Sequence, residues 1–155
     1  MSNSEIHDHA HSERRHWMSV LARADGAELA TRLEGCGPLP AYARLRGPET
    51  GLVMVRGRTG GGGAPFNLGE MTVTRCTVRT DSGQIGHAYV AGRDERQAEL
   101  AALADALLQD PARASAVQGA VIRPLAAAQQ DQRTRLTAKA AATKVQFFAM
   151  QNMRS

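Results

Sequence analysis

The chain has 155 residues, enough for one domain with an ordinary hydrophobic core. Its two cysteines, Cys36 and Cys76, lie apart, and neither stands in a CxxC motif or beside a histidine at metal-ligand spacing, which argues against a zinc site or a disulfide framework. No segment supplies the apolar run of a signal peptide or a membrane span, so we expect a cytoplasmic protein.

The chain is mildly basic, with a net charge of +4 and a pI of about 9.7. Its arginines are spread along the whole chain among acidic residues, and aromatic residues make up only 4%. This composition does not favour a nucleic-acid-binding surface, which needs clustered basic residues and stacking side chains. The basicity suits general solubility, an anionic small molecule or an acidic partner subunit.

The N-terminal part predicts a short tail followed by two helices. Residues 1–11 are polar and predict a disordered tail, and residues 12–153 predict a single α+β domain. Ser12 can cap a first helix and Asp25 a second, which ends near Gly35. Packing explains this helix pair without a role in reading DNA. The tail carries three histidines, His7, His9 and His11. Without fixed supporting groups, these do not make a functional metal site.

The next segment predicts two strands and a flexible loop. Strands are expected over 41–46 and 52–58, joined as a hairpin around the Gly-Pro-containing segment 47–51. The Gly-rich segment 59–65 has little side chain to pack, so we expect a flexible connector. A phosphate-binding P-loop would need a following Lys, which is absent, and a loop ordered by a partner stays open as an alternative.

The clearest strand pair is predicted over 70–79 and 84–92, joined by the turn 81–83 with Gly83 in the left-handed position. This turn places Thr80 opposite Gln84 and so fixes which side chains share a face. One face is small and mostly apolar, suited to packing against a helix, and carries Thr74, Cys76, Val78, Gly86, Ala88 and Val90. The opposite face is more polar and carries Arg75, Thr77, Arg79, Ile85, His87 and Tyr89.

The polar face supplies four of our candidate partner-binding residues: Arg75, Arg79, His87 and Tyr89. An antiparallel sheet can also present such a face to water, and a ligand-facing role is a further alternative.

The C-terminal part predicts helices. One spans 94–109 and stops at Asp110-Pro111, and a long one runs from about 124 to 153. The long helix outruns a core of this size, so it either folds back on the sheet or docks on another chain. Phe147 and Phe148 near its end complete the candidate partner-binding residues. The predicted fold class is α+β, with an N-terminal helix pair, an antiparallel sheet of about four strands and C-terminal helices.

Motifs for self-contained catalysis are missing from the sequence. It contains no HExxH, GxSxG, CxxC or Walker pattern. His16 and His87 are isolated histidines, which serve structure or solvation more often than catalysis. We therefore predict no catalytic residue and no metal ligand in this chain.

Several segments together resemble one known family, and Arg15-His16-Trp17-Met18-Ser19-Val20-Leu21-Ala22 is the most specific of them. The others are Ala27-Glu28-Leu29-Ala30, Glu49-Thr50-Gly51-Leu52-Val53, Phe66-Asn67-Leu68-Gly69-Glu70, Thr74-Arg75, Val78-Arg79, Gly92-Arg93-Asp94 and Val145-Gln146-Phe147-Phe148-Ala149-Met150. Over residues 13–150 the chain is similar to the PhnG family, the G subunit of the bacterial carbon-phosphorus lyase core complex. The His-containing tail and the four-glycine run are departures from it.

The resemblance implies a role in using phosphonates as a phosphorus source. In that family the G, H, I and L proteins transfer the ribose triphosphate of ATP to an alkylphosphonate and release adenine. The G, H, I and J subunits form a stable core, the K and L proteins associate with it, and the I subunit is regarded as carrying the nucleoside-cleaving site. ATP is thus implied as a co-substrate, and an iron-sulfur cluster and S-adenosylmethionine for a partner subunit. The alternative to this subunit role is a small independent module that binds an anion or a nucleic acid.

Overall fold

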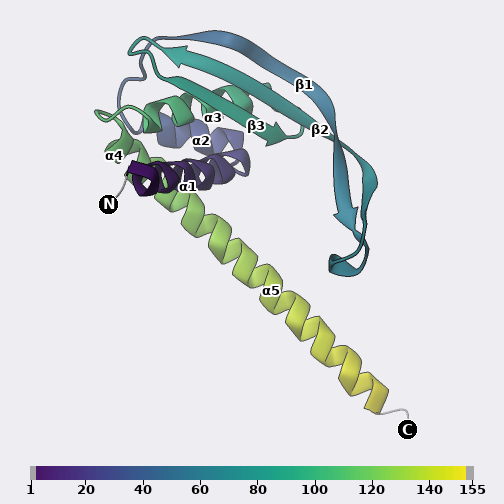
Figure 1. Cartoon of the computed structure of the whole chain (residues 1–155). Coiled ribbons are helices and arrows are strands. Elements are labelled where there is room, and N and C mark those ends of the chain that lie inside the picture. Colours follow the sequence, from purple (N-terminus) through teal and green to yellow (C-terminus); the bar gives the residue numbers. More distant parts are fainter. Residues whose placement is uncertain (1–2, 153–155) are drawn as a thin grey trace.

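The computed structural model is an α+β fold in which helices cover one face of a three-stranded antiparallel sheet (Figure 1). It describes the backbone of residues 3–152 and the side chains of residues 8–143. The predicted fold class is confirmed, although the sheet has three strands rather than about four.

Two helices open the fold, as predicted: α1 (Asn3–Ala22) and α2 (Gly26–Glu34). Asp25 caps α2, because its carboxylate accepts the backbone N–H groups of Ala27 and Glu28, both at 3.0 Å. The sequence placed residues 1–11 in a disordered tail, whereas the structure continues α1 back to Asn3. The tail is polar but contains no helix-breaking residue, so it can extend the helix that the buried side chains further along anchor.

The first predicted hairpin is wrong. Residues 42–58 form one continuous strand, β1 (Tyr42–Arg58), which pairs antiparallel with β2 (Pro65–Thr80). The chain reverses instead through the 3₁₀ turn η1 (Thr59–Gly61) in the four-glycine run. Gly60 and Gly61 have φ values of 60° and 81°, which glycine adopts without strain. The segment around Pro48 is accommodated inside β1 by shifts in register.

The second predicted hairpin is confirmed. β3 (Ile85–Ala91) pairs with β2, the N–H of Thr80 donates to the carbonyl of Gln84 at 3.0 Å, and Gly83 has a φ of 95°. The predicted apolar face of this hairpin packs against α3 (Glu95–Leu108). Gly86 permits the close approach, because a Cβ there would collide with the backbone of α3 at Ala102.

The C-terminal helices run through α4 (Ala114–Val117) and the π-helical turn η2 (Gln118–Ile122) into α5 (Arg123–Asn152), so the predicted long helix is confirmed. Leu125 near the start of α5 is buried, whereas residues 130–143 are all exposed. The helix therefore projects away from the body as a rod (Figure 1). None of the described helices is long and apolar enough to cross a membrane.

A fully buried carboxylate, that of Asp105 on α3, joins three elements. It accepts two hydrogen bonds from the Arg14 guanidinium at 2.8 and 3.2 Å and one from Trp17 Nε1 at 2.9 Å, both on α1. It also accepts the backbone N–H of His87 on β3 at 2.9 Å. Because burial of a lone charge is costly, this set of donors makes Asp105 a fixed junction between α1, α3 and the edge of the sheet.

We expect Asp105→Ala to lower the free energy of unfolding by about 3–5 kcal/mol, because it leaves the Arg14 and Trp17 donors without their buried acceptor. Asp131→Ala is the matched control, since Asp131 is an exposed helical aspartate and its loss should change stability by less than about 0.5 kcal/mol. Urea denaturation measures both. Equal stability of the two variants would contradict the role assigned to Asp105.

Candidate functional site

The predicted polar face of the sheet lies on the side away from the helices. Its residues meet in the predicted register, with Arg75 opposite Tyr89, Thr77 opposite His87 and Arg79 opposite Ile85. Tyr89 keeps 51% of its surface exposed, and Arg75, Arg79 and His87 are also exposed. We call these six residues the outer face. It brings together the four sheet residues singled out from the sequence.

Hydrogen bonds fix part of the outer face. The Arg75 guanidinium pairs with the carboxylate of Glu49 on β1 at 2.9 Å, and Glu49 also lies 3.6 Å from Arg46. His87 Nδ1 and the Thr77 hydroxyl are 3.2 Å apart. Among the described residues, no ion pair involves Arg79. The outer face therefore presents one arginine held by an acid, one available for a partner, and an aromatic side chain.

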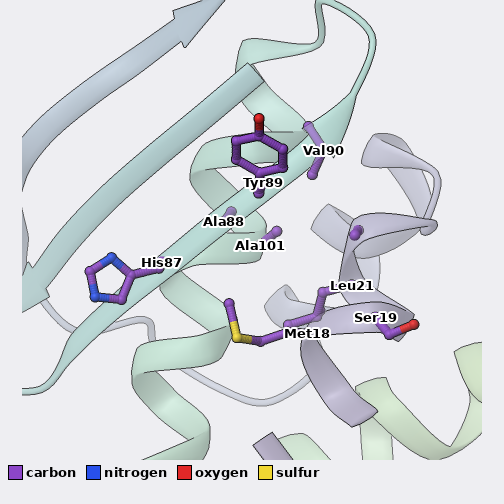
Figure 2. A pocket seen from close by; sticks show the side chains of 9 residues that line it. Met18, Ser19, Leu21, His87, Ala88, Tyr89, Val90 and Ala101 are labelled. Carbon is purple, nitrogen blue, oxygen red and sulfur yellow. The ribbon is translucent and has the colours of Figure 1, made fainter. Parts of the chain in front are cut away.

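Two pockets meet near His87, where β3 passes α1. Figure 2 shows the apolar one, with His87 and Tyr89 on the strand and Met18 and Leu21 on the helix around it. The second is a wider, more open hollow lined by polar side chains of α1 and by His87. Its further lining residues are Asp8, His11, Arg14, Arg15 and Met18. Since Arg14 is already engaged by Asp105, this hollow offers mixed charges rather than a dedicated anion cradle.

A group of ionisable side chains lies on the covered side of the sheet. Glu99 on α3 accepts the Tyr42 hydroxyl at 2.8 Å and binds the Arg44 guanidinium at 2.8 and 2.9 Å. The Arg44 hydrogen bonds hold the pKa of Glu99 below its usual value, and burial together with Glu99 raises the pKa of Tyr42 to about 12. This cluster ties β1 to α3 and is structural.

The described residues give little support to a nucleophilic cysteine or to a metal site. Burial raises the pKa of the Cys76 thiol, which keeps it protonated and weakly nucleophilic. Among the described residues, no group of three or more His, Cys, Asp or Glu side chains could hold a metal ion.

The candidates on the last helix are only partly described. Leu136, Ala140 and Thr143, which precede the two phenylalanines on α5, are exposed. The side chains of Phe147 and Phe148 lie outside the described residues. Over residues 130–143, whose side chains are all exposed, α5 does not fold back on the sheet.

Sequence reasoning missed a set of exposed apolar side chains on β1 and β2. These lie on the half of the hairpin that extends past the helices (Figure 1), and they are Leu52, Met54, Phe66, Leu68 and Met71. The predicted strands 52–58 and 70–79 included Leu52, Met54 and Met71 but not Phe66 or Leu68, and nothing in the sequence showed that the covering helices end before this part of the hairpin.

Comparison with known proteins decides the family. A family model described as "Phosphonate metabolism protein PhnG" matches residues 12–153. The chain belongs to the PhnG family. It is 47% identical, over 139 residues, to the alpha-D-ribose 1-methylphosphonate 5-triphosphate synthase subunit PhnG of Rhizobium meliloti (strain 1021), and the aligned part covers 90% of this chain and 88% of that relative. The resemblance to the PhnG family stated from the sequence is confirmed.

We expect Arg75→Ala to lower the free energy of unfolding by less than about 1 kcal/mol, because its ion pair with Glu49 is half exposed to solvent. Val78→Ala on the same strand is the comparison, since it removes buried methyl groups and should cost about 2 kcal/mol. Thermal and urea unfolding distinguish the two. If Arg75→Ala destabilises as much as Val78→Ala, the outer face serves the fold rather than a partner.

Proposed function

We propose that this chain is a non-catalytic subunit of alpha-D-ribose 1-methylphosphonate 5-triphosphate synthase. The observation that carries the proposal is the 47% identity, over nearly the whole of both chains, with a protein named as the PhnG subunit of that synthase. The aligned part covers 90% of this chain and 88% of that relative, so the likeness extends over the whole domain rather than one segment.

The reaction is the transfer of the ribose triphosphate of ATP to an alkylphosphonate, with release of adenine, in carbon-phosphorus lyase phosphonate degradation. The proposed partners are the H, I and J subunits of the core complex, with the K and L proteins associated. ATP is the co-substrate of the complex, and the iron-sulfur cluster and S-adenosylmethionine belong to a partner subunit. We propose that the complex carries out this reaction in the cytoplasm.

The chemistry supports a division of labour among subunits. Displacing adenine from the anomeric carbon passes through a cation-like transition state, which requires an oriented phosphonate oxygen and a group that assists the departing base. On the outer face, Arg75 is bound to Glu49 and His87 lies against Thr77, so these groups do not form such a set by themselves. The chain would contribute surfaces that hold the catalytic subunit in place.

The outer face is the first of these proposed surfaces. Arginine and tyrosine are enriched where proteins bind one another, because each combines a large contact area with directional hydrogen bonds. Arg79 and Tyr89 meet this description on an exposed, rigid sheet, with Arg75 and His87 beside them. We assign these four residues to partner contact and none of them to catalysis.

We expect adenine release from ATP and methylphosphonate only when this chain is combined with its partner subunits. Three reactions are compared by chromatography: the purified chain alone, the partner subunits without it, and the complete mixture. We expect turnover in the third reaction alone. Substantial adenine release by the purified chain would overturn the non-catalytic assignment, and full activity without the chain would overturn the subunit assignment. Tight binding of RNA or ATP by the chain alone would favour an independent binding module instead.

A further inference from the structure

The hairpin of β1 and β2 has a half that neither β3 nor the helices support. β3 pairs with residues 73–79 of β2 only, so beyond that point β2 pairs with β1 alone. Figure 1 shows this two-stranded half, which we call the arm, extending past the helical layer. Two strands without a third strand or a covering helix are marginally stable in water.

The hydrogen-bond pattern shows which main-chain groups of the arm point away from the sheet. The bonds from Thr80 N–H to Gln84 C=O and from Gly92 N–H to Thr72 C=O, one at each end of β3, show that the even-numbered residues of β2 direct their main-chain groups to the β3 side. The odd-numbered residues of β2 are therefore bonded to β1. Their partners on β1 are Gly51, Val53 and Val55, which lie opposite Val73, Met71 and Gly69.

It follows that Thr50, Leu52 and Met54 direct their N–H and C=O groups to the free edge of β1. Within the described part of the chain, no loop or side chain is hydrogen bonded to these main-chain groups. The side chains of Leu52 and Met54 are 63% and 52% exposed. This edge thus offers a row of main-chain donors and acceptors next to exposed apolar side chains.

The two halves of the β1 edge differ in their protection against pairing. Residues 44–49 contain Pro48 and two shifts in register, which interrupt the edge. Residues 50–55 keep a regular register opposite 69–74 and contain no charged residue. An exposed edge of this kind invites pairing or aggregation unless another chain covers it.

We propose that residues 50–55 of β1 receive an extended segment of another subunit of the synthase, which adds a fourth strand to the sheet. The inference rests on the proposed function for the presence of that subunit. Strand addition supplies main-chain hydrogen bonds to Thr50, Leu52 and Met54, and the side chains beside the edge set the specificity. The occupant is an extended segment that is apolar at its centre.

Charge identifies the occupant further. Arg44, Arg46 and Arg75 near the body are each within ion-pair distance of an acid. Arg56 and Arg58 follow the edge on the arm, and no described residue forms an ion pair with either. The added segment therefore carries an acidic residue beside these two arginines, where it satisfies the charge at a rim position.

A second copy of this chain fits the edge less well. An antiparallel pair centred on residues 52–53 would place Arg46, Gly47 or Pro48 opposite Arg58, depending on the register, and none of these is acidic. The nearest acid, Glu49, is already bound to Arg75 and Arg46. The geometry therefore favours a different chain over self-association.

The test is co-expression of tagged variants of the full chain with the H, I and J subunits, followed by affinity recovery of the complex. Leu52→Pro removes an outward N–H and no bond of the β1–β2 ladder, and it should reduce recovery at least about tenfold. Leu52→Thr is the matched control, because it keeps the N–H and should reduce recovery no more than about fivefold. Thermal unfolding of each isolated variant establishes that it is folded.

Wild-type recovery separates the two proposals. If the wild-type chain recovers no partner subunit, the proposed function fails. If the wild-type chain recovers the partner subunits and folded Leu52→Pro recovers them equally well, strand addition at this edge is overturned. It is also overturned if Leu52→Thr loses as much recovery as Leu52→Pro. Should Leu52→Pro not fold, Met54→Pro and Arg58→Glu decide in the same way: reduced recovery supports the proposal and wild-type recovery overturns it.

Discussion

The buried carboxylate of Asp105 is the constraint on which the arrangement depends. It holds α1, α3 and the edge of β3 together at one end of the sheet, because its hydrogen-bond donors come from α1 and from the main chain of His87. The helices consequently cover β3 and the adjoining half of the β1–β2 hairpin. Among the described residues, the outer face, the arm and residues 130–143 of α5 remain without cover from this chain.

These uncovered surfaces fit the proposed role of this small α+β chain as a non-catalytic subunit of a multi-subunit enzyme. A rigid body presents a polar sheet face, an apolar strand edge and a projecting helix, and each can contact a different neighbour. The arm and residues 130–143 of α5 also bury little surface within the chain, so their ordered positions would gain stability from the proposed partner contacts. Membership of the PhnG family agrees with this division, since the relative is named as a synthase subunit.

The sequence predicted those parts of the fold that depend on interactions between residues close together in the chain. The turn at Gly83 fixed the register of β2 and β3, and hence the pairing of Arg75 with Tyr89. The segment around Pro48 carried similar turn signals. It nevertheless forms part of one strand, because β1 pairs with β2 on both sides of it. Asp105 was not singled out from the sequence. Its partners on α1 are 88 and 91 residues away, and such distant contacts leave no local pattern.

Amide hydrogen exchange at the edge of β1, before and after assembly, tests the central claim that partner subunits complete this chain. In the isolated chain the N–H groups of Leu52 and Met54 point to solvent and should exchange rapidly, whereas that of Val53 is bonded to β2 and should exchange slowly. Assembly should slow Leu52 and Met54 by at least about 100-fold and bring them to the level of Val53. Rapid exchange of Leu52 and Met54 within an intact, active complex would contradict the account.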